Sequence, residues 1–458
     1  MAAFFSKDDN RGSVLLYVMV FGTLAFSLVV VAVSGYSFGE YKAAVHRGNR
    51  ETALQIAEAG INYYRWHLAH SPTDYKDGTN HDGPYVHDYI DGSGVSIGSY
   101  SLVITPPSPT SSIVTVESTG WLSVQTSSQR IVRVSLGRAA LTDYSFISNT
   151  DVWIGNNTSV HGPMHSNSGI RFDGVADAPI TSAVATYICK PLHGEGCNNE
   201  EKPGVWGQGG PESYWSFPVP SEDFTGGTPS LTQIKDNAIN GGLYFSSSGE
   251  QGWLLKFNNT GTVTASKVTA TKCYKGDDLN GANNSWFCVD IKTEGSGTTY
   301  PLPANGSLYV DDITWIDGVV RGQATVGVGT GKSAIINDNI TYYNGASGTD
   351  KFGIIADQDI LIPHDSPDDL EVNAALFATN GSAKRYYYTG DHKDSLSIFG
   401  SVVSAGTMTW SWVSNGGATV SGYDDITLTY DSRLLSNPPG GFPVESETRL
   451  VSWEEVKN

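Results

Sequence analysis

Four cysteines, which form two pairs local in the sequence, are the first residues whose types and spacing suggest chemistry. Cys189 and Cys197 would close a loop of about 8 residues, and Cys273 and Cys288 one of about 15. Neither spacing is that of a CxxC metal motif, and only His193 lies at ligand spacing from a cysteine. We therefore expect two disulfides rather than a metal site, and an oxidising, extracytoplasmic compartment for this part of the chain.

Paired carboxylates are the second candidate for chemistry, because glycoside cleavage uses two of them on either side of the scissile bond. Asp357 and Asp359 alternate along the chain and would share one face of a strand. In a chain with 47 acidic residues, however, such pairs are typical of solvated turns. The sequence predicts no catalytic activity, no cofactor and no metal, with polysaccharide cleavage at these two residues as the alternative.

Four tryptophans are candidates for a ligand-binding or adhesive surface. Trp410 and Trp412 alternate along a predicted strand and so share one side of it, whereas Trp206 and Trp215 flank a glycine-rich stretch. An exposed indole can stack on a sugar or form the centre of a protein interface. Burial in a hydrophobic core is the commoner role of tryptophan, and it remains the alternative.

These residues must be positioned by the rest of the chain, which is organised around an apolar stretch near its start. Residues 14–33 carry no charge and are rich in Val, Leu and Phe. As a helix with a rise of about 1.5 Å per residue they would cover about 30 Å, the thickness of a bilayer's hydrocarbon core. A cleaved secretory signal would have a shorter apolar core. We predict a single membrane-spanning helix. The residues expected to contact lipid or the helices of a filament are Val14, Leu15, Tyr17, Gly22, Ala25, Leu28 and Val33.

A second helical pattern follows the apolar stretch. Apolar residues recur at spacings of three and four, which places them on one face of a helix. They are Leu54, Ala57, Ile61, Tyr64 and Leu68. Charged residues interleave with this stripe, and Pro72 ends the pattern. We expect one helix over residues 13–70, with a globular domain docked on the apolar stripe of its second half.

The start of the chain resembles the type IV pilin-like family, in particular the PilX-type minor pilins and related pseudopilins. A short polar leader (residues 1–12) contains Lys7 and Arg11 and ends at Gly12, directly before the apolar stretch. Residues 55–61 read QIAEAGI, similar to the alanine-rich AEAG stretch of PilX-type proteins. The resemblance implies that prepilin peptidase cuts between Gly12 and Ser13, and that the mature helix packs among the helices of other subunits.

Two departures from the family pattern bear on the type of subunit. The family usually has Phe directly after the cut, where this chain has Ser13. Its major pilins carry Glu at the fifth mature position, where the carboxylate pairs with a neighbour's N-terminal amine, and here that position is Tyr17. Some tip-located pseudopilins also lack this Glu. The resemblance therefore implies a minor, priming or tip subunit rather than the bulk subunit of a filament.

Beyond the helix, the sequence predicts an α+β protein with a small antiparallel sheet and a large, mainly β domain. The small domain covers residues 71–140, with a polar loop over 71–98 and alternating runs at 99–105, 112–118 and 129–136 as its strands. The large domain covers residues 141–435.

The large domain has a periodic apolar pattern. The pairs Ile335-Ile336, Ile354-Ile355, Leu376-Phe377 and Ile398-Phe399 lie 19, 22 and 22 residues apart. One apolar patch per coil of about 20 residues is typical of a parallel β-helix, a solenoid that we favour over a β-sandwich. Both cysteine pairs fall in a predicted insertion at about residues 183–305, and residues 436–458 are expected to cap the last exposed coil.

Charge and compartment complete the interpretation. A net charge of −19 repels phosphate backbones, so nucleic acid is not an expected partner. We interpret the chain as a single-pass membrane protein with an extracytoplasmic C-terminal domain at the cell surface. It would be a minor subunit, at the tip or in priming, of a type IV pilus or related secretion filament, displaying its β domain for adhesion or partner binding.

The expected partners are the membrane, other pilin or pseudopilin subunits, prepilin peptidase, and a surface carbohydrate or protein ligand. The alternative is a membrane-anchored β-helix that never enters a filament and serves as an adhesin or a polysaccharide-active enzyme. Whether the leader is cut would distinguish the two.

Overall fold

The computed structural model describes residues 11–107, 113–225, 227–279, 281–414, 418–435, 437–442 and 444–456. The chain forms two compact units. The first contains the N-terminal helix and most of a small sheet, and the second, which we call the body, is built mainly from Ser135–Val451. As expected, a long N-terminal helix and a small antiparallel sheet are joined to a large, mostly β domain.

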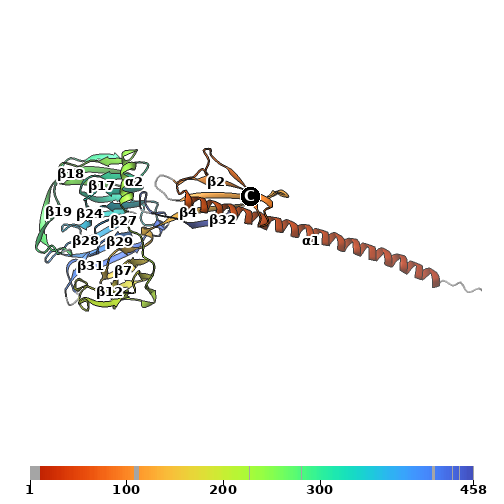
Figure 1. Ribbon diagram of the computed structural model, residues 1–458, viewed down its shortest axis with the longest axis horizontal. Helices are drawn as coiled ribbons and strands as arrows, with labels where there is room; N and C mark the ends of the chain where they lie inside the picture. The colour runs from red at the N-terminus through yellow and green to blue at the C-terminus, as the bar shows by residue number, and fades with distance from the viewer. Residues whose placement is uncertain are drawn as a thin grey trace, which may run out of the picture. The chain divides into compact units, whose positions relative to one another are not determined.

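The N-terminal helix α1 (Arg11–His70) is one uninterrupted helix of 60 residues (Figure 1). Every residue from 14 to 48 is exposed, including all of the uncharged stretch. Among the described residues, α1 is the one helix long and apolar enough to cross a membrane. The first half of α1 therefore packs against none of the residues that the structure describes.

The small sheet has five strands in the order β1-β2-β3-β4-β32. They are β1 (Tyr85–Ile90), β2 (Ser96–Thr105), β3 (Val114–Leu122), β4 (Gln125–Ala140) and β32 (Val444–Val456). β1 and β2 pair antiparallel, with Tyr85 opposite Leu102. β1 lies within residues 71–98, which the sequence predicts to be a polar loop. The alternating pattern of β1 covers only six residues, too few to indicate a strand there.

Residues 436–458 were expected to cap the last exposed coil of the body. Their strand, β32, is instead the fifth strand of the small sheet, next to β4. Ion pairs connect the two strands: Arg133 contacts Glu454 at 2.9 Å, and Arg130 pairs with Glu455. Arg133 also pairs with Glu117 on β3 at 2.8 Å. No local pattern shows that a strand will pair with a segment some 300 positions away in the sequence.

The second half of α1 docks on the small sheet. Ala57, Ile61, Tyr64 and Leu68 of the predicted stripe are buried, whereas Leu54 is only half-buried. The contact face is wider than predicted, since Ala53, Ile56 and Gly60 are buried as well.

Glycines on both elements permit this close docking. A Cβ at Gly60 would lie 2.4 Å from Ser118 Oγ, and one at Gly120 on β3 would lie 2.4 Å from the backbone of Ala53 and Ala57. Gly120, within β3, is thus the point where the helix and sheet backbones meet.

The body is built from parallel ladders. In the first, each strand pairs with the next in the order β16 (Leu243–Phe245), β21 (Ser307–Val310), β23 (Gln323–Val328), β25 (Lys351–Ala356), β27 (Asp369–Ala378), β29 (His392–Ser404), β5 (Phe146–Ser148), β8 (Met164–Ser166), β11 (Ile180–Ser182) and β15 (Trp215–Ser216). The second runs through β17 (Gly252–Asn258), β22 (Thr314–Val320), β24 (Ala334–Tyr342), β26 (Ile360–Ile362) and β28 (Ala383–Arg385). The third runs through β24, β27, β29, β31 (Thr419–Tyr430), β7 (Thr158–His161) and β10 (Val175–Ala176). A short fourth ladder joins β6 (Val152–Ile154), β9 (Ile170–Phe172) and β14 (Val205–Trp206).

The chain enters this stack in the middle rather than at an end. Phe146 on β5 pairs with Val402 on β29, and Thr158 on β7 pairs with Ile426 on β31. β7 lies beside β31 in Figure 1. From β5 the chain runs to one end of the first ladder at β15, then resumes at the other end at β16. Helix α2 (Gly227–Ile239) lies between these two strands in the sequence and packs on β16, β21 and β23. Residues 183–305, predicted to be one insertion, therefore contain both end strands of the first ladder, β15 and β16.

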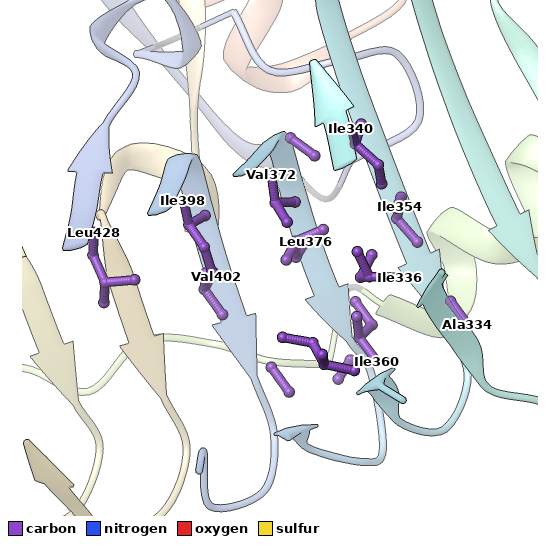
Figure 2. Packing of buried hydrophobic residues seen from close by; sticks show 14 of the residues in the cluster. Ala334, Ile336, Ile340, Ile354, Ile360, Val372, Leu376, Ile398, Val402 and Leu428 are labelled. Carbon is purple, nitrogen blue, oxygen red and sulfur yellow. The ribbon is translucent and has the colours of Figure 1, made fainter. Parts of the chain in front are cut away.

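The interior between the ladders is apolar (Figure 2). Ile354, Leu376 and Val402 follow one another along the first ladder, and Val372, Ile398 and Leu428 along the third. Of the four apolar pairs used to infer a period, only Ile354-Ile355 and Leu376-Phe377 stack directly on each other. Ile336 pairs with Ile316 on the second ladder instead. The connections between strands vary in length, so the sequence period is irregular although the stacking is regular.

We predict that Gly120→Ala loosens the first unit, because its Cβ would meet helix backbone that cannot rotate away. Overpacking of this kind typically costs about 1–3 kcal/mol. Hydrogen exchange of the peptides covering residues 53–64 should be faster than in the unmodified chain. Gly92→Ala is the control, since a Cβ at Gly92 meets nothing within 4 Å. Equal exchange in both variants would contradict the close docking.

Candidate functional site

The residues predicted to form the membrane or filament helix lie on the exposed first half of α1. Val14, Leu15, Tyr17, Leu28 and Val33 are between 58% and 70% exposed. Gly22 and Ala25 are exposed on the same stretch, and a Cβ at Gly22 would meet nothing within 4 Å. This part of α1 offers an apolar surface of helical shape with small residues at which another helix can approach closely.

The predicted cleavage site lies at the start of the same helix. Gly12 and Ser13 fall in the first turn of α1, while residues 1–10 of the predicted leader lie outside the described residues.

Both predicted disulfides are present: Cys189 is bonded to Cys197, and Cys273 to Cys288. The first closes a loop between β12 (Thr186–Cys189) and β13 (Glu200–Pro203). The second bridges β18 (Thr262–Gly276) and β19 (Ser285–Glu294), an antiparallel hairpin. Both bonds therefore constrain loops that project from the parallel ladders.

The two cross-linked loops meet at one pocket of about 170 Å³, which we call the tryptophan pocket. The first loop contributes Leu192 and His193, and the tip of the hairpin contributes Leu279. The remaining walls come from Trp153, Gly155, Asn157 and Thr158 near β6 and β7, from residues 407–413, and from Ile426 on β31. Segments distant in the sequence thus converge here.

The tryptophans predicted as a ligand surface divide into two groups. Trp410 and Trp412 both line the tryptophan pocket, with Trp410 only 2% exposed. Trp206 is not part of the pocket lining: it packs against Tyr187, Cys189 and Cys197, and its indole N–H donates to Tyr187 at 2.9 Å. Trp215 packs against the interior of the body and is not part of the pocket. Sequence reasoning missed Trp153, whose position becomes significant only when β6 is placed beside the first loop.

Arg171 holds the first loop against Trp153. Its guanidinium lies 4.6 Å from the Trp153 ring and 5.3 Å from the Trp206 ring. One of its terminal nitrogens donates to the carbonyl oxygens of His193 and Glu195, each at 2.6 Å. Its Nε donates to Asp173, which also accepts the indole N–H of Trp153. One side chain therefore orients both an indole and the loop backbone.

Asp151 also anchors the loop closed by Cys189 and Cys197. Its carboxylate contacts His193 at 2.7 Å and Lys190 at 3.0 Å, and both Asp151 and His193 are almost fully buried. Burial alone would raise the pKa of Asp151, but the hydrogen bonds from His193 and Lys190 lower it to about 2. The carboxylate is thus ionised at neutral pH and committed to the loop.

The hairpin tip is fixed by a second set of contacts. Asp277 forms a backbone bridge with Tyr387, whose ring lies edge-on to Trp412 at 5.7 Å. Asp278 pairs with the buried Lys384 at 3.1 Å. The indole N–H of Trp412 donates to the carbonyl oxygen of Arg385 at 3.2 Å. The hairpin tip and Trp412 are therefore held by backbone, ion-pair and hydrogen-bond contacts, as the first loop is.

A larger groove of about 660 Å³ lies along β18, β19 and β22. It contains two buried carboxylates, Asp290 and Asp317, and burial raises the pKa of both. Asp290 accepts backbone N–H groups of His364 and Asp365, and Asp317 accepts from the amide of Asn337. These contacts make the carboxylates part of the wall of the groove.

Asp357 and Asp359, the carboxylates considered for catalysis, also form structural hydrogen bonds and ion pairs. Asp357 accepts from the backbone of Gly331 at 2.7 Å, and Asp359 accepts from the backbone of Ser382 at 2.8 Å and pairs with Lys384. Among the described residues, no group of three or more His, Cys, Asp or Glu side chains is placed to hold a metal ion.

We predict that Gly194→Ala opens the tryptophan pocket. Gly194 has φ of 81°, and its Cβ would lie 2.8 Å from the Trp153 ring. The loop must move away, which should raise the exposure of Trp153 and increase quenching of indole fluorescence by iodide. Gly196→Ala is the matched control, since Gly196 has φ of 85° but its Cβ would lie 3.7 Å from the nearest side chain. The same quenching in both variants would show that backbone strain, rather than contact with Trp153, controls the loop.

The lowered pKa of Asp151 predicts how the loop responds to acid. A carboxyl whose pKa falls from 3.8 to about 2 on folding contributes stability that is present above about pH 4 and lost as the pH falls towards 2. Asp151→Asn should remove this contribution, about 2 kcal/mol, at neutral pH.

Hydrogen exchange of the peptide covering residues 189–197 measures this effect. The unmodified loop should lose protection between about pH 4 and 2, and the variant should already lack it. The control is Asp177→Asn, because Asp177 pairs with His161 at 2.8 Å but is 60% exposed. A loop that keeps its protection in Asp151→Asn would refute the anchoring role of this carboxylate.

No protein-family model matches the chain, and no curated protein is significantly similar to it. Among solved structures, the chain is similar to the crystal structure of the competence-associated pilin ComZ from Thermus thermophilus. The two chains are 13% identical, the match covers 89% of this chain and 98% of that one, and the TM-score is 0.27. At so low a TM-score, the similarity carries no weight for the function of this chain.

Proposed function

We propose that the protein is a pilin-like minor subunit, anchored by α1 and displaying its body outside the membrane for adhesion or partner binding. The observation that carries the proposal is the division of α1 into two halves. Residues 14–48 are exposed throughout, and residues 14–33 among them are uncharged, whereas one face of residues 53–68 is buried against the small sheet. A helix of this kind needs lipid, or the helices of other subunits, around its first half.

Three features of the chain support the pilin-like interpretation over a simple anchor. Gly12 directly precedes the apolar stretch, as in a prepilin leader. The helix continues without a break from the apolar stretch into the docked half. Its docked half contains the alanine-rich stretch that resembles PilX-type proteins, and Ala57 and Gly60 of that stretch lie in the contact with the sheet.

We further propose that the body is a parallel β-helix. Support comes from the three parallel ladders that enclose an apolar interior, with each ladder contributing successive strands. In such a stack each coil buries its apolar patch against its neighbours. A bulky body of this kind, together with Tyr17 in place of the family's Glu, favours a minor or tip position.

The orientation is inferred from the disulfides. Cys273 and Cys288 lie on exposed strand positions, where a reducing cytosol would keep them as thiols. The body is therefore proposed to be extracytoplasmic. The role is assembly and binding rather than catalysis, because the candidate carboxylates are committed to structural contacts.

The mass of the mature chain tests the pilin-like route. Protein recovered from native membranes should begin at Ser13, and Gly12→Leu should retain the leader and be absent from sheared surface filaments. Gly22→Leu is the control: it places the same side chain at an exposed helical glycine away from the proposed cut, so the leader should still be removed. An unmodified chain that retains Met1 would favour the alternative, a static anchor that never enters a filament.

A further inference from the structure

The tryptophan pocket presents aromatic faces whose orientation is fixed. The indole N–H groups of Trp153 and Trp412 are bonded to Asp173 and to the carbonyl oxygen of Arg385. Because their polar edges are committed, these rings offer a ligand their apolar faces and C–H edges. Arg171 covers one face of Trp153, so that ring can present only its other side.

Neutral hydrogen-bonding groups surround these rings. Asn157, Thr407, Thr409 and Ser411 all line the pocket. Ser411 Oγ accepts from the Asn157 amide at 3.2 Å and keeps its own hydrogen to donate. Thr409 Oγ1 donates to the carbonyl oxygen of Ser411 at 3.2 Å and keeps its lone pairs to accept. The pocket thus combines apolar faces with uncharged donors and acceptors.

Among the described residues that line the pocket, none offers a partner for a charged ligand. None of these lining residues is Lys, Arg, Asp or Glu, and the one titratable side chain among them, His193, is committed to Asp151. A charged group would lose its hydration here without compensation. A volume of about 170 Å³ is also below the range of about 300–1,000 Å³ typical of sites for drug-sized ligands, and suits a single ring.

We propose that the tryptophan pocket binds one uncharged sugar ring of a glycan. A pyranose has apolar C–H faces that stack on indole and a rim of hydroxyl groups that matches the neutral side chains. The two disulfide-closed loops hold the walls in place, so little ordering entropy is lost on binding. The inference rests on the proposed display of the body at the cell surface, where such a glycan would be met.

The test uses the full chain in phospholipid nanodiscs, because detergents with sugar headgroups would occupy the site. Methyl glycosides of glucose, galactose, mannose and N-acetylglucosamine are added at millimolar concentration, and binding is followed by saturation-transfer NMR and calorimetry. At least one glycoside should bind. Trp412→Ala should weaken that binding about tenfold, the equivalent of one lost stacking contact.

Two further variants separate binding from folding. Leu192→Ala removes a pocket wall residue that is 44% exposed, so it should weaken binding without unfolding the body. Trp286→Ala removes an indole that is 64% exposed on β19 but is not part of the pocket, so it should leave binding unchanged.

Several results would overturn the inference. They are the absence of binding by any of the glycosides, binding insensitive to both pocket variants, or tighter pocket-dependent binding of tetramethylammonium, which would indicate a cation cage. If the glycosides fail but the leader is still removed at Ser13, only the sugar inference falls. If the leader is retained while a glycoside binds, the pilin-like proposal falls instead.

Discussion

The constraint on which the structure depends is that the first half of α1 cannot remain in water. Phe26, Leu28 and Val31 are each 70% exposed, and they are typical of the whole uncharged stretch. Burying one such side chain is worth about 1.5–3 kcal/mol, so the summed cost of leaving the stretch in water exceeds the net stability of a typical domain. Lipid or other helices would remove this cost, and the described globular parts of the chain dock only where the helix becomes amphipathic.

α1 is one continuous helix, and the docking contact holds its second half closely on the small sheet. Gly60 on the helix and Gly120 on β3 remove the side chains that would otherwise separate the two elements. The helix therefore rests on the sheet at close range, with the buried Tyr64 and Leu68 extending the contact towards its end. Contacts of this kind resist sliding of the helix over the sheet.

Local patterns allowed the sequence to predict the elements that depend on neighbours in the chain. The extent of α1 and most of its docking stripe follow from helical periodicity, and the cysteine pairing follows from short loop lengths. The pairing of β5 with β29 could not be predicted, since Phe146 and Val402 are brought together only after the whole intervening chain has folded. The same holds for β32, for the pocket wall formed by Trp153, and for Gly120, whose role depends on which backbone faces it.

The placement of the two disulfides argues that their role is local. A chain of 458 residues with a continuous apolar interior has enough buried surface to fold without cross-links. Both bonds lie outside that interior and close short loops, where a cross-link contributes less to global stability than it would across a long one. What they constrain is the position of the two loops that contribute Leu192, His193 and Leu279 to the lining of the tryptophan pocket. Rigid walls reduce the entropy that is lost on binding. Both disulfides therefore lie where they would favour the ligand binding proposed for the tryptophan pocket.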